Sequence, residues 1–175
     1  DGLVLVAPAI LSRDTIPAYQ AASLWVLAHT MPWLSVSGQG IKRNPSDNIE
    51  MLRALGRDPL VIKHTRVDSV WGLVNLMDDA LAAASQFVAP SLFLLGANDD
   101  IVPPTASRQL LAALPKTAGA GQTIAVYPDG FHMLLRDLQS SVVWEDILTW
   151  IDDPTAQLPS GGDVSDPISA LPDLD

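Results

Sequence analysis

Residues 91–103 read SLFLLGANDDIVP, an apolar run that ends in a glycine and a pair of aspartates. Residues 123–132 read TIAVYPDGFH, and residues 3–7 read LVLVA. Each run is short and almost continuously apolar, which is typical of strands buried on both faces of a parallel sheet. The runs predict strands over Leu3–Ala7, Ser91–Ala97 and Thr123–Tyr127.

Amphipathic helical patterns alternate with these strands. Apolar residues recur every three or four positions within 105–114 and again within 141–151, so each segment is expected to bury one face of a helix. Strand and helix in alternation predict an α/β fold with a parallel sheet covered by helices.

Residues 11–87 have a different character, because about eighty residues between consecutive strands exceed any ordinary crossover. We expect a helical insertion, a lid over residues 12–69, above the carboxyl ends of the strands. Helices are expected around 18–28, 46–55 and 70–87, the last returning to the sheet. Ser46 or Asp47 is the expected N-cap of the second helix.

The tryptophans of this region, Trp25, Trp33 and Trp71, have two interpretations. They could line an acyl-binding pocket, or they could pack the lid against itself. The sequence leaves both open.

Composition excludes several classes of function. Ten basic and twenty acidic residues give a net charge of −10, which argues against nucleic acid or an anionic membrane surface as a partner. The absence of cysteine excludes disulfides and thiolate catalysis. No apolar run approaches the roughly 20 residues of a membrane span, so a cytoplasmic or peripherally membrane-associated location is favoured. Residues 153–175 are acidic and rich in Pro, Ser and Gly, and we expect a flexible tail after a domain over 1–152.

Asp99 follows the second strand and His132 follows the third. Because the carboxyl ends of parallel strands share one edge of the sheet, these side chains are expected to meet. A carboxylate that accepts from one imidazole nitrogen leaves the other free to take a proton from a nucleophile. Asp100 is the alternative acid, otherwise a solvated or turn residue, and Asp129 is expected to be a turn residue.

The remaining histidines, His29 and His64, lie in the predicted lid without a partner in the local pattern, which favours core or surface roles. No cluster of ligands has the spacing of a metal site, so neither a metal nor a cofactor is expected.

The Gly-x-x-Asp-x-Ile-Val-Pro pattern over Gly96–Pro103, with Gly-Phe-His at 130–132, resembles the acid and histidine loops of α/β-hydrolases. More narrowly it is similar to the monoacylglycerol lipase and lysophospholipase-like group, which includes serine aminopeptidase-type proteins. Residues 1–9, 57–60 and 72–81 agree with this resemblance. It implies a serine hydrolase of lipid-like esters, with Asp99 as triad acid and His132 as general base, acting on a small-molecule ester or lipid.

The chain departs from that family in one respect: Gly-x-Ser-x-Gly, the motif of the nucleophile, does not occur, and residues 35–40 (SVSGQG) lack the leading glycine. The resemblance therefore implies the C-terminal half of the hydrolase sheet, with the nucleophile and the oxyanion hole in an N-terminal half that acts as partner. If the chain acted alone, Ser12 and Ser37 would be the first candidate nucleophiles.

Two kinds of alternative function remain. The same fold supports peptidase, haloalkane dehalogenase and epoxide hydrolase chemistry, the last two with an Asp nucleophile. A non-catalytic binding module is the alternative of another class.

Overall fold

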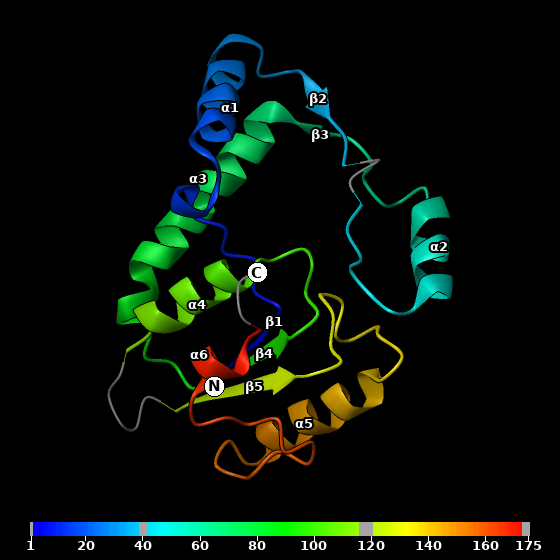
Figure 1. Ribbon diagram of the computed structural model, residues 1–175, viewed down its shortest axis with the longest axis vertical. Helices are drawn as coiled ribbons and strands as arrows, with labels where there is room; N and C mark the ends of the chain where they lie inside the picture. Colours follow the sequence, from blue (N-terminus) through cyan, green and yellow to red (C-terminus); the bar gives the residue numbers. More distant parts are fainter. Residues whose placement is uncertain (1, 39–41, 116–120, 173–175) are drawn as a thin grey trace.

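The computed structural model describes residues 2–38, 42–115 and 121–172 (Figure 1). Its main sheet consists of three parallel strands in the order β1 (Leu3–Val6), β4 (Ser91–Gly96) and β5 (Gln122–Tyr127). The strands predicted from the apolar runs are therefore confirmed, each within one residue of its expected ends.

Helices cover both faces of this sheet, which confirms the predicted α/β architecture. Phe93 and Leu95 pack on the side of α4 (Pro104–Ala113) and the short helix α6 (Pro167–Ala170). Leu92 and Leu94 pack on the opposite side, under α5 (Ser140–Asp152) (Figure 1). Because side chains alternate along a strand, the fully buried β4 contributes to both cores, and this explains its continuous apolar run.

The long connection between β1 and β4 rises from the sheet and returns through the helix α3 (Val67–Ala83), which continues into a 3-10 turn over Ala84–Gln86. A 3-10 turn (Arg13–Thr15) leads into α1 (Ala18–Thr30), which packs alongside α3, and α2 (Ile49–Arg57) stands apart from both (Figure 1). Within the described part of residues 12–69, no segment joins the main sheet. None of the described helices is long and apolar enough to cross a membrane.

The insertion also contains a short antiparallel pair that the sequence did not predict, β2 (Ser35–Val36) with β3 (Thr65–Arg66). The expectation of helices and loops alone was wrong at this point. Two-residue strands carry no periodic pattern, and this pairing joins residues some thirty positions apart.

The N-cap of α2 also differs from the prediction. Asn48, rather than Ser46 or Asp47, caps the helix, because its side-chain oxygen accepts from the Met51 N–H at 3.1 Å. The side chains of Ser46 and Asp47 bond instead to the loop that follows β5. Tertiary contacts therefore decided between neighbouring residues with similar capping propensity.

The predicted flexible acidic tail is wrong for its described residues, 153–172. Leu158 and Leu171 are 2% and 5% exposed and belong to the two cores of the sheet. Asp163 bridges to Ala125 of β5, and Arg108 on α4 donates to the Leu171 carbonyl at 2.9 Å. Isolated apolar anchors in a polar, proline-rich stretch have no periodicity, so composition alone favoured disorder.

Replacement of an anchor tests this packing. We expect Leu158→Ala to lower the free energy of unfolding by about 2–5 kcal/mol, because it leaves a cavity in a closed core. Leu148→Ala on α5 is the matched control, because its side chain is 62% exposed and a surface change is worth about 0.5 kcal/mol or less. Chemical denaturation of both variants gives the comparison, and equal small effects would mean that the tail does not pack.

Candidate active site

The loops that leave β4 and β5 meet through two glycines. A Cβ at Gly96 would lie 2.5 Å from the carbonyl oxygens of Gly130 and Phe131, closer than any real side chain approaches. Asn98 joins the loops further, since its backbone N–H donates to the Gly130 carbonyl at 2.8 Å and its side chain donates to the Pro128 carbonyl at 3.0 Å. The two loops are thus held as one unit.

This unit brings Asp99 and His132 together. Nδ1 of His132 lies 2.8 Å from Oδ2 of Asp99, and the side chains are 25% and 10% exposed. The other oxygen of Asp99 accepts from the backbone N–H groups of Ile101 and Val102, at 2.8 and 2.9 Å. These bonds fix the plane of the carboxylate, so an Nδ1–H donates to Asp99 and Nε2 is left for proton transfer to a third group.

The alternative aspartates point elsewhere. Asp100 accepts from the Asn44 N–H at 3.1 Å and pairs with Arg43 at 3.1 Å. The hydrogen bond from Asn44, followed by the one from Arg43, lowers the pKa of Asp100. Asp129 lies exposed in the turn after β5. Of the three aspartates considered, Asp99 is the one that the structure places against His132.

The other histidines occupy the insertion. His29 stacks on Trp25 with ring centroids 4.5 Å apart and meets the edge of Trp71 at 5.6 Å, so it packs between α1 and α3. His64 is exposed, just before β3. Trp25 and Trp71 contact His29, although Trp25 is still 52% exposed, and Trp33 is 66% exposed.

The two serines considered as nucleophiles lie in different surroundings. Ser12 is 4% exposed and its hydroxyl donates to Gln109 on α4 at 3.1 Å. Ser37 is exposed and follows β2 in the insertion. In the described ranges, no three His, Asp or Glu side chains are grouped so as to hold a metal ion.

The surface beside the imidazole is mainly apolar. A shallow depression there is lined by Val6 at the end of β1, by His132 itself and by the residues that follow it, 133–136. Met133, Leu134 and Leu135 make this lining mainly apolar, and Arg136 is its other ionisable residue besides His132. The chemistry of this surface suits an apolar group near His132.

Sequence reasoning missed one residue of this region, Asp137. It is 5% exposed, and its carboxylate accepts from the Phe131 N–H, directly before His132, at 2.9 Å. The available signal was its position, because Arg136 and Asp137 interrupt an apolar stretch, with Asp137 five positions after His132. A single carboxylate without periodicity does not reveal its burial, and so the residue escaped notice.

Comparisons with known proteins agree on one group. The family model described as "Serine aminopeptidase, S33" matches residues 1–139. A monoacylglycerol lipase of Mycolicibacterium smegmatis is 25% identical over 154 residues, which cover 85% of this chain and 52% of that protein. The chain thus spans about half the length of the curated relative it matches.

Solved structures show the same likeness. The monoacylglycerol lipase of Paleococcus ferrophilus is 28% identical with a TM-score of 0.69, over 88% of this chain and 59% of that one. A soluble variant of the monoglyceride lipase of Saccharomyces cerevisiae, in complex with a substrate analog, has a TM-score of 0.64 over 87% of this chain and 55% of that one. At 18% identity the yeast structure supports the fold alone.

The glycine contact gives a test of the geometry. We expect Gly96→Ala to destabilise the protein by about 1–3 kcal/mol or more, because the added methyl group forces two backbone segments apart. Gly72→Ala on α3 is the control, because a Cβ there meets nothing within 4 Å and alanine in a helix is favoured over glycine by about 1 kcal/mol. Urea denaturation measures both, and a neutral Gly96→Ala would contradict the close approach.

Proposed function

The chain belongs to the serine aminopeptidase S33 family, in the monoacylglycerol lipase-like group of α/β-hydrolases, and we propose that it supplies the acid and the base of a serine hydrolase that cleaves carboxylic esters of apolar, lipid-like substrates. The observation that carries this proposal is the 2.8 Å contact between Asp99 and His132 at the carboxyl ends of adjacent parallel strands. The names of the relatives favour a monoacylglycerol as the type of ester.

The reaction follows from the free nitrogen of His132. A serine hydroxyl attacks the acyl carbonyl while Nε2 takes its proton, and the imidazolium then donates that proton to the departing alcohol. Asp99 holds the ring in the required tautomer and stabilises its positive charge. In the second half of the reaction a water molecule attacks the acyl-serine ester, and His132 takes its proton. The imidazolium then returns that proton to the serine as the carboxylic acid leaves. In this proposal backbone N–H groups outside the chain hold the oxyanion.

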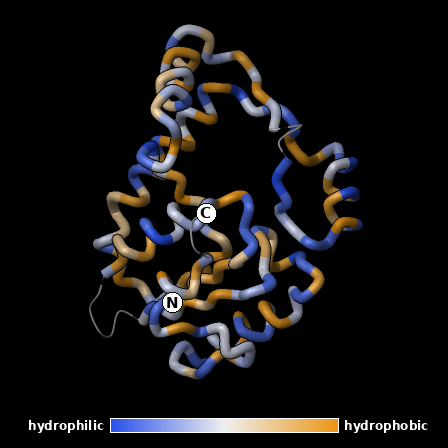
Figure 2. Tube along the Cα trace, in the orientation of Figure 1, coloured by the Kyte–Doolittle hydropathy of each residue, from blue (hydrophilic) through white to orange (hydrophobic). Residues whose placement is uncertain are grey.

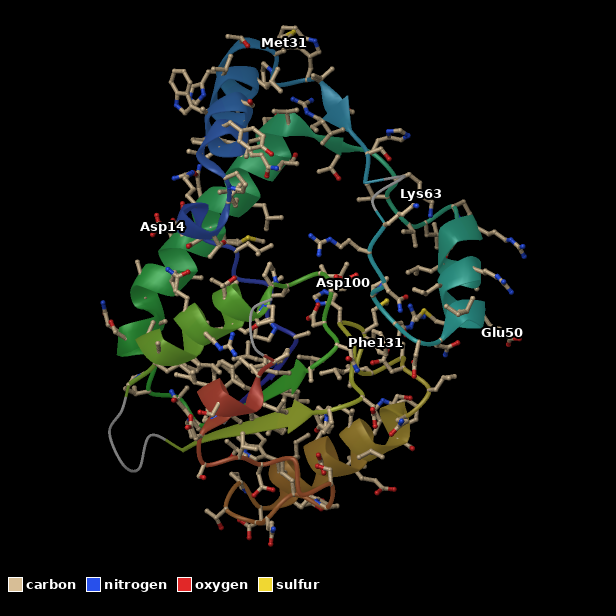
Figure 3. The ribbon with its side chains drawn as sticks, in the orientation of Figure 1. Asp14, Met31, Glu50, Lys63, Asp100 and Phe131 are labelled. Atoms are coloured by element: carbon tan, nitrogen blue, oxygen red, sulfur yellow. The ribbon has the colours of Figure 1, made fainter. Side chains whose placement is uncertain are left out.

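The apolar depression beside His132 supports an acyl group as the part of the substrate that binds there. The insertion over residues 12–69 is proposed as the lid of this site. It leaves the sheet at the carboxyl end of β1, on the side where the loops of Asp99 and His132 emerge, and residues 43–48 contact both loops (Figure 3).

The nucleophile is proposed to lie in an N-terminal half of the same hydrolase. Within the described residues, β1 pairs with β4 and with no other strand, so its second edge has unpaired N–H and C=O groups. A further strand that ends in Gly-x-Ser-x-Gly would pair there and bring its serine toward His132. The coverage of about half of each relative supports this arrangement.

Substitution of the pair tests the proposed chemistry in the full-length protein. We expect His132→Ala to abolish hydrolysis of a short-chain ester, and Asp99→Asn to lower kcat by about 10,000-fold, because the amide favours the wrong tautomer. Asp129→Asn is the control, because this exposed turn residue lies outside the pair. Labelling by a fluorophosphonate should be fast in the unmodified protein and slow in both variants. A full-length protein that neither hydrolyses esters nor reacts with the label would contradict the proposal.

The division of the site between two halves can be tested separately. We expect the 175-residue chain alone to hydrolyse no ester, and addition of an N-terminal segment that carries Gly-x-Ser-x-Gly to restore turnover, because the base then has a nucleophile to activate. Spectrophotometric ester assays on the chain, the segment and the mixture give the answer. Turnover by the chain alone would place a nucleophile within it, and Ser12→Ala and Ser37→Ala would then identify which serine reacts.

A further inference from the structure

Residues 43–48, which we term the strap, form a hydrophilic segment that contacts both loops of the site (Figure 2). Toward α2 the strap is bonded to residues 131–138, the loop that carries His132. Three hydrogen bonds join them besides the one made by Ser46. The Met133 N–H donates to the Pro45 carbonyl at 2.9 Å, and the Asn48 side chain donates to the Arg136 carbonyl at 3.0 Å. The Leu138 N–H donates to the Asp47 carboxylate at 2.9 Å. This loop contains neither helix nor strand over 131–138, so it depends on such bonds for its conformation.

A buried pair lies at the centre of these contacts. Ser46 is fully buried and Asp137 is 5% exposed, and the Ser46 hydroxyl donates to Oδ1 of Asp137 at 2.6 Å. The second oxygen, Oδ2, accepts from the Phe131 N–H at 2.9 Å. One carboxylate therefore joins the insertion to the backbone N–H of Phe131, the residue before His132.

A buried carboxylate often contributes less to stability than an apolar side chain of similar size. Its removal from water is unfavourable unless both oxygens accept hydrogen bonds, and apolar residues of similar volume are often at least as stable. What the carboxylate adds is direction, since each oxygen fixes one donor at a set distance and angle. At Asp137 those donors belong to the strap and to the backbone beside the imidazole.

The other end of the strap holds the acid loop. Arg43 donates to the backbone carbonyl of Asp100 at 2.8 Å and pairs with its carboxylate, which also accepts from the Asn44 N–H. Asp100 directly follows Asp99 in the chain. Figure 3 shows the labelled Asp100 and Phe131 on the two loops beside this segment. This second contact is exposed and ionic, so salt screens it, whereas the contact at Asp137 is shielded.

We propose that Ser46 and Asp137 are positioning residues for proton transfer at His132, a buried pair that fixes the loop of the base to the strap. The inference rests on the proposed hydrolase function. Loss of the pair releases the Phe131 N–H, and His132 then shifts relative to Asp99 and to the nucleophile. A misplacement of about 1 Å at a reacting group lowers the rate by about 100-fold.

Activity of the full-length protein gives the first test. We expect Asp137→Ala and Ser46→Ala to lower kcat for a short-chain ester by about 10- to 100-fold with KM within about twofold, because the substrate surface remains. Asp137→Asn should recover most of the rate, since its oxygen accepts from Phe131 and its amide donates to Ser46.

Asp146 on α5 offers a matched control. It is also fully buried, and it accepts from the Tyr127 hydroxyl at 2.7 Å and from the Ser160 N–H at 2.9 Å, away from the strap. Asp146→Ala should lower Tm by a similar amount but leave kcat of the folded protein unchanged. Equal losses of kcat at Asp137 and Asp146, or an unchanged kcat in folded Asp137→Ala, overturn the inference.

Hydrogen exchange gives a readout that does not need turnover. In Asp137→Ala, amides of residues 43–48 and 131–138 should both exchange faster, whereas Asp146→Ala should leave residues 43–48 protected. Faster exchange in one of the two segments alone overturns the link between them. If the unmodified protein hydrolyses no ester, the proposed function fails, and the exchange pattern still decides whether the pair fixes the loop of His132.

Discussion

The close approach of Gly96 and Gly130 is the constraint on which the site depends. Adjacent parallel strands end about 4.8 Å apart, and loops that leave them diverge when side chains separate their backbones. Here the two loops touch, because a Cβ at Gly96 would lie 2.5 Å from two carbonyl oxygens. Asn98 then joins the loops with its backbone and its side chain. This close contact of the two loops brings Asp99 and His132 within 2.8 Å of each other.

Three aspartates near this point differ in their partners rather than in their chemistry. Two backbone N–H groups hold one oxygen of Asp99, so the other oxygen faces His132. Asp100, one residue later, turns outward and takes its donors from the strap. Asp137 lies buried and accepts from the loop of His132. The hydrogen-bond donors that reach each carboxylate thus determine whether it orients a ring, anchors a strap or fixes a loop.

The same distinction explains what the sequence could predict. A strand buried on both faces, such as β4, has a continuous apolar sequence and can be recognised from it. The ends of such strands place Asp99 and His132 at one edge of the sheet. The packed residues around Leu158, the β2–β3 pair and Asn48 as the N-cap depend on partners distant in sequence. Asp137 belongs to this second class, since nothing local distinguishes a buried carboxylate from a solvated one.

Residues 43–48 of the insertion make polar contacts with the loops of the site, and none of its described strands joins the main sheet. It begins after the carboxyl end of β1, beside the loops of Asp99 and His132, and returns through α3 to the amino end of β4, at the opposite edge of the sheet. Any chain that leaves the sheet there passes the site, but only specific donors and acceptors make it hold the loops. Ser46 and Asn44 provide them. A shift of the insertion therefore displaces the loops of Asp99 and His132 more directly than the core of the sheet.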